Sequence, residues 1–188
     1  MDIYGIYRNA RNAAWQCLID YNITSLPVDL LKIAKEAGIK VLKNSSLHEL
    51  DQNESGAAIL VEGVWYLVYD DGDTMGRRRF TIAHELGHIF LGHELVDGYH
   101  GRTVANCRPQ LEIEADLFAA RLLAPACVLW GLNADTPEKI ADICNISMAS
   151  AKIRADRMRV LYERQNFLTH PLEVMVYEQF RGFMKDKN

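Results

Sequence analysis

The chain opens with apolar side chains at helical spacing. They recur every three or four positions, which places them on one face of a helix over residues 3–21. A second helix is expected from Pro27, a residue type favoured at the first helical position, to a stop at Gly38. Both patterns are typical of amphipathic helices that pack on a core. The apolar face of the first helix comprises Ile3, Tyr7, Ala10, Ala14, Leu18 and Tyr21.

The pattern then changes to short apolar runs that are typical of strands. Residues 38–42 have β-like character, and two runs rich in β-forming residues, Gly56–Val61 and Val64–Tyr69, flank the dipeptide Glu62-Gly63. A glycine-containing dipeptide between two such runs is typical of a hairpin turn. The sequence therefore predicts a small antiparallel sheet.

Helical spacing returns in the second half of the chain. Residues 79–91 carry one helical pattern that should end near Gly92, and residues 111–123 carry another that Pro125 ends. Because helices flank the strands on both sides, we predict an α+β fold that is mostly helical. The apolar face of the later helix comprises Leu111, Ala115, Phe118 and Leu122.

Residues beyond 132 carry the signals of a helical lobe. Thr136 can cap a helix that has Pro137 at its first position, and Ser147 can cap a second helix over residues 148–161. This pair resembles a helix-turn-helix. A last helix is expected over residues 171–184, with an apolar face that would cover the core or pair with another subunit. That face comprises Leu172, Met175, Val176, Gln179, Phe180 and Phe183.

The helix pair leaves two alternatives open. Residues 152–164 hold five basic and two acidic side chains, a local charge of +3 that would suit contact with DNA. Short helix pairs are also common without DNA, so the lobe could instead pack beside the core and dock a protein substrate. We favour this second alternative. The basic residues are Lys152, Arg154, Arg157, Arg159 and Arg164, and the acidic ones are Asp156 and Glu163.

Length and composition are those of a globular protein with a sizeable core. Of the 188 residues, 49% are hydrophobic, and we expect a core domain over residues 1–132 with the helical lobe, residues 133–188, packed on it. The formal net charge of −4 gives no general reason to expect nucleic-acid binding. The cysteines are scattered without a CxxC pair, which argues against a disulfide scaffold or a cysteine zinc site. They are Cys17, Cys107, Cys127 and Cys144.

The sequence carries no signal for export or for a membrane. The amino terminus has no basic stretch that leads into an apolar run. Glu62 interrupts one long apolar run, and Arg121 and Pro125 interrupt another. We therefore expect a cytoplasmic protein with reduced thiols and no membrane span.

Candidate chemistry is concentrated in His84-Glu85-Leu86-Gly87-His88, an HExxH sequence. Two histidines four residues apart lie on one face of a helix, so their imidazoles can converge on a single divalent ion. Glu85 is rotated about 100° from His84 around the helix axis, which lets it reach a metal-bound water without binding the metal itself. A metal ion, a water and a carboxylate base are what hydrolysis requires, and Zn²⁺ is the expected metal.

A catalytic zinc ion takes three protein ligands, so a third ligand must be found. The extended pattern HExxHxxGxxH fails, because Leu91 and Glu94 occupy the positions of its glycine and last histidine. The helix over residues 111–123 offers Glu112, with Asp116 one turn further along the same face. Glu112 is the candidate ligand, and Asp116 is the candidate acceptor for the other ring proton of a ligating histidine. Glu114, rotated about 200° from Glu112, is less suited to the ligand role.

Two separated motifs and their flanks carry a family resemblance. The first is HELGH preceded by residues 79–83, RFTIA, and the second is residues 112–120, EIEADLFAA, followed by residues 122–125, LLAP. Together they resemble the ImmA/IrrE family of bacterial metallopeptidases, over roughly residues 25–165. The agreement of two motifs makes the resemblance specific.

The resemblance implies a zincin-like metallopeptidase core with a gluzincin-like site. In that site His84, His88 and Glu112 would bind zinc, and Glu85 would be the base. It also implies a cytoplasmic protein substrate, such as a transcriptional repressor of a phage, a mobile element or a stress response. The family often has Asn where this chain has Asp116.

Two questions stay open at this point. The donor that stabilises the oxyanion could be His93, Tyr99 or His100, which lie between the two motifs. The strand Gly56–Val61 could present an edge that pairs with an extended substrate. The main hypothesis is a zinc endopeptidase that cleaves a cytoplasmic protein. The alternative is a regulatory protein that acts mainly by binding a protein partner or DNA through its C-terminal lobe.

Overall fold

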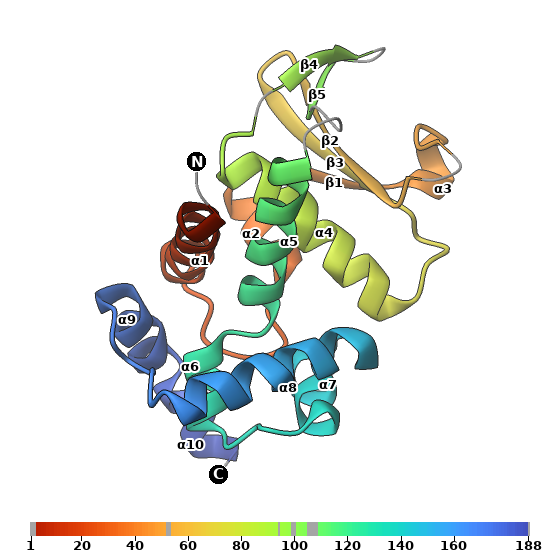
Figure 1. The fold of residues 1–188 in the computed structure, drawn as a ribbon. Helices are drawn as coiled ribbons and strands as arrows, with labels where there is room; N and C mark the ends of the chain where they lie inside the picture. Colours follow the sequence, from red (N-terminus) through yellow and green to blue (C-terminus); the bar gives the residue numbers. More distant parts are fainter. Residues whose placement is uncertain (1–2, 52–53, 94, 99–100, 105–108, 188) are drawn as a thin grey trace.

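The computed structural model describes residues 3–51, 54–93, 95–98, 101–104 and 109–187. In these ranges the chain forms helices separated by a small group of strands (Figure 1). The helices are α1 (Ile3–Asp20), α2 (Leu30–Glu36), α3 (Asn44–Leu47), α4 (Met75–Phe90), α5 (Pro109–Leu123), α6 (Ala126–Gly131), α7 (Pro137–Cys144), α8 (Met148–Glu163), α9 (Pro171–Gln179) and α10 (Arg181–Lys187). The strands are β1 (Lys40–Lys43), β2 (Gly56–Val61), β3 (Val64–Tyr69), β4 (Leu95–Gly98) and β5 (Gly101–Val104). The fold is therefore α+β and mostly helical, as predicted.

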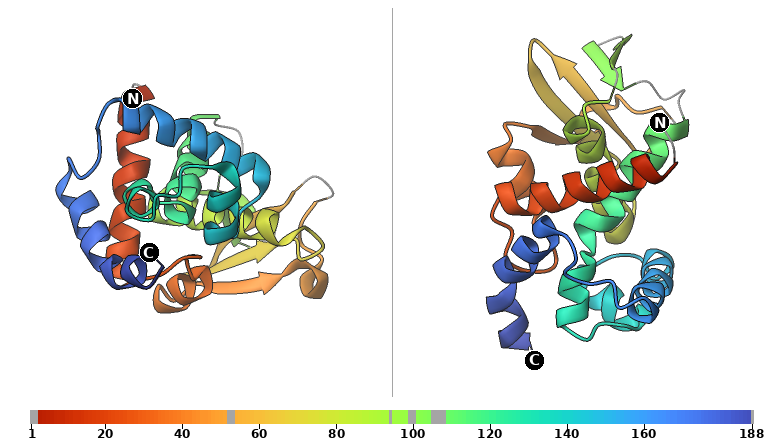
Figure 2. Two further views of the ribbon diagram at one scale, coloured as in Figure 1. Left: turned by 90° about the horizontal axis from the view of Figure 1, so that it is seen from below. Right: turned by 60° about the vertical axis from the view of Figure 1, so that its left-hand side comes forward.

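The sheet lies at one end of the molecule, and α7 and α8 lie at the other (Figures 1 and 2). Between them, α4 and α5 pack side by side, and α4 also contacts β2 and β3. Helix α1 packs along α5, and α9 packs against α1. Side chains from α4, α5 and β2 can therefore meet beneath the sheet.

The strands form one mixed sheet in the order β1-β3-β2-β5-β4. The predicted hairpin is confirmed: β2 and β3 pair antiparallel, and Val61 faces Val64 across the turn. Strand β1 pairs with β3 in parallel, so the prediction of a purely antiparallel sheet is wrong at this edge. The hydropathy pattern predicts that a run of residues is a strand, whereas its direction depends on which neighbour it pairs with.

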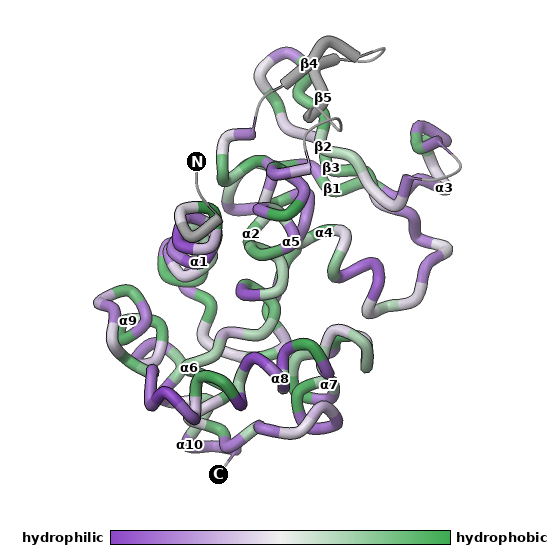
Figure 3. Tube along the Cα trace, viewed as in Figure 1, coloured by the Kyte–Doolittle hydropathy of each residue, from purple (hydrophilic) through white to green (hydrophobic). Residues whose placement is uncertain are grey.

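The core extends along the chain from α5 into α6. Figure 3 shows this stretch, together with β2 and β3, as mostly hydrophobic. Every residue from Leu122 to Leu129 is buried. A segment that is buried on all sides has no polar face to mark its period, which explains why the pattern did not predict α6.

Helix α2 begins later than the sequence predicted. Its first residue is Leu30, because Asp29 caps the helix and its carboxylate accepts a hydrogen bond of 2.9 Å from the backbone N–H of Lys32. An aspartate cap satisfies an amide that has no partner within the helix. Pro27 therefore precedes the helix, and the prediction that it occupies the first helical position is wrong.

The last predicted helix is divided into α9 and α10. The division falls at Phe180, which is fully buried, whereas Met175 on the predicted apolar face is 50% exposed. Gln179 fixes the end of α9, because its side-chain amide donates hydrogen bonds of 2.7 Å to the carbonyl oxygens of Leu18 and Ile23. The segment covers the core at the end of α1, and the prediction of one continuous face is wrong.

Helices α7 and α8 begin at the predicted caps. Thr136 and Ser147 accept hydrogen bonds from Lys139 N and Ser150 N respectively. The turn between the two helices packs on the first turn of α4, where a Cβ atom on Gly76 would lie only 2.9 Å from the backbone nitrogen of Ser147. Glycine is needed at this close approach. The boundary between residues 132 and 133 stays a prediction.

The cysteines in the described ranges are free thiols. Cys17, Cys127 and Cys144 are buried, and burial raises the pKa of the last two to about 12. Cys107 lies outside the described residues.

Within the described ranges, none of the helices has both the length and the hydrophobicity that a bilayer crossing requires.

Candidate metal centre

Helix α4 places three of the predicted site residues. Thr74 caps the helix, which continues to Phe90 and ends just before Gly92, where the sequence predicted it. His84 and His88 are one turn apart, and their Nε2 atoms face each other at 2.9 Å. The two imidazoles therefore direct ring nitrogens at one point, as the HExxH spacing predicted.

Gly87, inside the motif, lets α5 approach α4 closely. A Cβ atom on Gly87 would lie 3.2 Å from the Cα atom of Ala115 and 3.1 Å from the ring of Phe118. The two helices cross at this point with little space between their backbones. This crossing brings the first turn of α5, with Glu112, to the histidines of α4.

Glu112 completes a cluster of possible metal ligands. Its carboxylate oxygens lie 3.2 Å from His84 Nε2 and 3.5 Å from His88 Nε2. Ligand atoms from the three residues all lie within 4.8 Å of one another. In a tetrahedral zinc site with bonds of about 2.0–2.2 Å, neighbouring ligand atoms are about 3.3–3.6 Å apart. The two histidine nitrogens are closer than that, and the carboxylate contacts lie within about 0.1 Å of this range, so the donor set fits a divalent ion such as Zn²⁺.

Asp116 lies behind His84, on the side of the ring away from the cluster. Its carboxylate oxygen is 2.8 Å from His84 Nδ1. If Nδ1 carries the proton and donates it to Asp116, the lone pair of Nε2 points at the metal position. This contact is the one that the sequence predicted for Asp116.

His93 lies in the corresponding place behind His88. The two Nδ1 atoms are 2.8 Å apart, and His93 Nε2 is 3.5 Å from a carboxylate oxygen of Glu114. With His88 donating from Nδ1, His93 accepts and directs its own Nε2–H toward Glu114. Sequence reasoning offered His93 as an oxyanion donor, but the structure buries it against His88 and away from the cleft. Its position just after the end of α4 is a sequence signal that could have indicated this contact.

The surroundings of the two histidines shift their pKa values in opposite directions. Burial, together with the neighbouring His84 and His93 rings, lowers the pKa of His88 to about 3. Burial also opposes a charge on His84, but the hydrogen bond to Asp116 and the carboxylates of Glu85 and Glu112 outweigh it and raise its pKa. His88 is therefore held in the neutral form that binds metal ions.

Glu85 is buried beside the metal position. Only 8% of the residue is exposed, and burial raises the pKa of its carboxyl to about 7, although the nearby His84 and the Ala58 backbone N–H favour the charged form. A carboxyl with a pKa near neutrality can both accept and return a proton at physiological pH. Such behaviour is required of a general base in hydrolysis.

A cleft of about 780 Å³ opens over these groups. Its floor is formed by the α4 and α5 residues of the site, and one wall is the stretch Gly56–Ile59 of β2. In the part of the chain that the structure describes, residues 56–58 pair with β3 on one side only, whereas Ile59 and Leu60 also pair with β5. In these described residues the side of residues 56–58 away from β3 faces the cleft, and the backbone N–H of Ala58 there donates to the carboxylate of Glu85.

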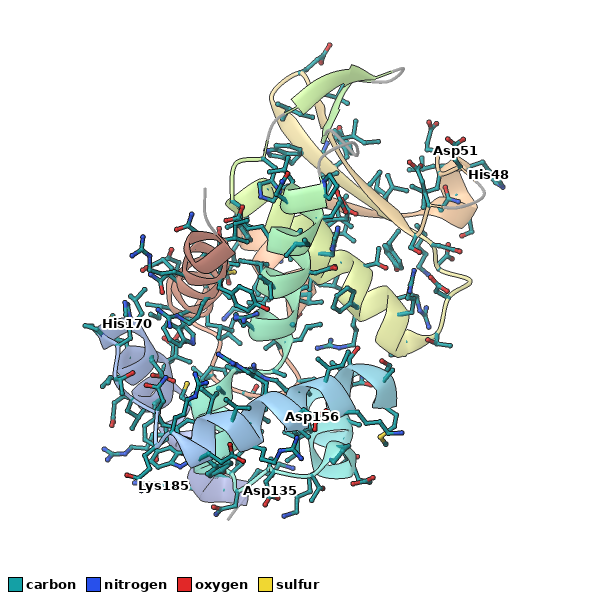
Figure 4. All side chains as sticks on the ribbon, in the orientation of Figure 1. His48, Asp51, Asp135, Asp156, His170 and Lys185 are labelled. Atoms are coloured by element: carbon teal, nitrogen blue, oxygen red, sulfur yellow. The ribbon has the colours of Figure 1, made fainter. Side chains whose placement is uncertain are left out.

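The far rim of the cleft is acidic. Glu49, Asp51 and Glu54 line it, together with Arg77 from α4. Figure 4 labels Asp51 beside α3, at the side of the sheet opposite β4 and β5. Tyr99 and His100, the other two candidates for the oxyanion donor, lie outside the described residues.

The comparisons with known proteins agree with this geometry. The family model described as Peptidase_M78, IrrE N-terminal-like domain, matches residues 34–156, which is more than half of the chain and includes both motifs of the cluster. The comparison with curated proteins gave no match.

Proposed function

Since the chain belongs to the IrrE N-terminal-like (Peptidase_M78) family, we propose that it is a zinc-dependent endopeptidase. The observation that carries the proposal is the convergence of His84, His88 and Glu112, from two helices, beside a buried Glu85 in an open cleft. The ligand set of two histidines and one glutamate leaves a coordination position for water. The peptidase activity that the family implies therefore agrees with the metal-assisted hydrolysis proposed for the site.

The mechanism follows from the positions of the side chains. A divalent cation held by the three ligands supplies Lewis acidity toward the attacking water and the peptide carbonyl. Glu85 removes a proton from the water as it attacks the carbonyl carbon, and then passes that proton to the leaving amine. Asp116 and the pair His93–Glu114 hold the two imidazoles in the orientation that metal binding needs.

We propose that the substrate is a protein segment in extended conformation. Residues 56–58 line the cleft on the side away from β3, and a substrate backbone would add to the strand there. The proposed substrate is a cytoplasmic protein such as a transcriptional repressor of a phage, a mobile element or a stress response. The buried free thiols are compatible with a reducing compartment.

One of the basic residues that favoured DNA binding by the C-terminal lobe is not accessible to DNA. Arg154, counted in the local charge of +3, is only 9% exposed and faces the interior. Electrostatic contact with DNA requires accessible side chains, so the exposed basic set on α8 is smaller than the sequence suggested. We therefore retain the endopeptidase as the proposed function.

The decisive experiment compares the wild-type protein with Glu85→Gln. Purified protein should contain zinc at a ratio of about one per chain and cleave a repressor encoded beside its gene. Glu85→Gln should keep the zinc and lose cleavage by about a thousandfold or more, because it removes the base and leaves the ligands intact. Retained cleavage in that variant would overturn the proposal, as would a wild-type protein that binds no metal.

A further inference from the structure

A second cavity lies where the core helices meet the C-terminal lobe. Its volume is about 200 Å³, and residues of α1, α4, α5 and α8 line it. The walls are mostly apolar, with Tyr7, Phe80 and Leu117 on the core side. On the lobe side stands Ile153, which is 74% exposed and gives the cavity an apolar entrance.

Three arginines stand together at this cavity. Arg121 comes from α5, and Arg154 and Arg157 come from α8. The same three also line a smaller neighbouring cavity of about 70 Å³, where Arg11 of α1 joins them. Four guanidinium groups from three helices therefore surround one small region.

This positive cluster has no ion-pair partner among the residues that the structure describes. In the ranges that the structure describes, no carboxylate forms an ion pair with Arg121, Arg154 or Arg157. Glu173 also lines the smaller cavity and accepts a hydrogen bond from the backbone N–H of Thr169, but it forms no ion pair with these arginines. Arg121 donates to the carbonyl oxygen of Leu117. Its guanidinium also lies over the Tyr7 ring, 5.2 Å from the centroid. Like charges this close, and without ion-pair partners among the described residues, repel one another.

Arg154 is the most exceptional of the group. Only 9% of the residue is exposed, and its Nε atom has no hydrogen-bond partner. Burial and, to a smaller extent, the neighbouring Arg121 lower the pKa of Arg154 to about 10. The thiols of Cys127 and Cys144 are close, but burial raises their pKa to about 12, so they are neutral at physiological pH. A buried, unpaired guanidinium is costly unless an anion compensates it.

We propose that this cavity is a binding site for a small organic acid, an oxyanion attached to an apolar body about the size of a benzene ring. The guanidinium groups of Arg154, Arg121 and Arg157 would receive the oxyanion, since planar forks of N–H donors match carboxylate and phosphate oxygens. The apolar walls would hold the body, because a cavity of about 150 Å³ is known to accommodate benzene. This inference is independent of the proposed peptidase function.

The site borders the metal centre through one side chain. Phe80 lines both this cavity and the catalytic cleft, and its ring centroid is 6.3 Å from that of His84. A ligand in the cavity therefore contacts a residue of α4 that also packs beside a proposed metal ligand. A ligand bound at this site would therefore contact helix α4, which carries the HExxH motif.

The test is a titration of the full chain with benzoate. Calorimetry measures the binding, and the melting temperature measures the stabilisation. Benzoate should bind with one site per chain and raise the melting temperature. Benzyl alcohol keeps the ring without the charge, and inorganic phosphate keeps the charge without the ring, so both should bind at least about tenfold more weakly. Each titration is repeated after chelation of zinc, because a carboxylate can also bind the metal centre.

The matched variants are Arg154→Met and Arg159→Met. Both change an arginine of α8, but Arg159 is exposed and pairs with Asp156. Figure 4 labels Asp156 on α8. Arg154→Met should fold with an unchanged or higher melting temperature, since it removes an unpaired buried charge. It should also weaken benzoate binding by about tenfold or more, whereas Arg159→Met should bind as the wild type does.

Several results would overturn the inference. They are equal binding of benzyl alcohol, equal binding of inorganic phosphate, undiminished benzoate binding in Arg154→Met, and loss of benzoate binding after chelation. The absence of any benzoate binding would do the same.

Discussion

The Nδ1 atoms of His88 and His93 are 2.8 Å apart, so one imidazole supports the other behind the proposed metal position. His93 is only 8% exposed and continues the contact to Glu114, whose carboxylate lies 3.5 Å from its Nε2 atom. If His93 accepts at Nδ1, the ring proton of His88 lies on Nδ1 and its Nε2 is free for the metal, with the carboxylate of Glu114 near the other side of His93. In this arrangement a histidine outside the HExxH motif prepares the motif for metal binding.

Replacement of His93 should weaken zinc binding without removing it. His93→Ala leaves His88 Nδ1 without its acceptor, and loss of such a supporting contact reduces metal affinity by about 10–100-fold. Competition with a chelating dye measures this change. His48→Asn is the control, because His48 is exposed beside α3, away from the ligand cluster, and Asn tolerates its left-handed backbone conformation. Equal zinc affinity in His93→Ala and in the control would contradict the supporting role.

Replacement of Glu112 by alanine and replacement of Asp116 by alanine should have different effects on zinc binding and cleavage. Glu112→Ala removes a proposed ligand and should leave little zinc bound after dialysis, with cleavage lost. Asp116→Ala removes the acceptor at 2.8 Å from His84 Nδ1, so zinc affinity should fall by about tenfold or more while cleavage persists at saturating zinc. Elemental analysis and cleavage rates at increasing zinc separate the two cases. The assignment would be reversed if Asp116→Ala were the variant that zinc could not rescue.

The metal-free protein should lose stability as Glu85 ionises. Burial raises the pKa of this carboxyl from 4.5 to about 7, so the folded state binds its proton more tightly than the unfolded chain does. The stabilisation from this group is complete below about pH 4.5 and is lost as the pH rises through about 7. The loss is on the order of 3 kcal/mol in the free energy of unfolding.

Denaturant titrations of the chelated protein between pH 4 and 9 measure this effect. Other groups titrate in the same range, so the quantity of interest is the difference between the wild type and Glu85→Gln, which cannot ionise at that position. The difference should grow in favour of the variant as the pH rises. A difference that stays constant with pH would show that Glu85 has an ordinary pKa.

Gly87→Ala should destabilise the protein although alanine favours helices. The new Cβ atom would lie 3.2 Å from Ala115 Cα and 3.1 Å from the Phe118 ring, so α5 must move away from α4. The strain of about 1–3 kcal/mol exceeds the helical gain of about 1 kcal/mol. Zinc affinity should fall as well, because the movement carries Glu112 away from the histidines.

Gly182→Ala is the matched control for that variant. Gly182 is also helical, but a Cβ atom there meets nothing within 4 Å. This change should raise the free energy of unfolding by up to about 1 kcal/mol and leave zinc affinity unchanged. Thermal melting and chelator competition measure both variants. An increase in stability in both would show that α4 and α5 are not in close contact at Gly87.

Much of the local structure was predictable from the sequence because its signals are local. The caps at Thr136 and Ser147, the turn at Glu62-Gly63 and the helical period around the HExxH motif each act within a few residues. For the same reason the facing of His84 and His88 follows from their spacing alone. Signals of this kind were weaker for α2, where Asp29 rather than Pro27 sets the first turn.

Only the tertiary structure decided how these elements meet. The distance from Glu112 to the histidines depends on the crossing of α4 and α5, the burial of Arg154 depends on the packing of the lobe, and the parallel pairing of β1 depends on its neighbour β3. Each is a contact between residues far apart in the chain, which no periodicity encodes. The sequence alone thus determined which side chains can do the chemistry, because the spacing of residues on one helix fixes the direction in which their side chains point. The fold decided which distant groups reach them, because packing of separate elements fixes distance.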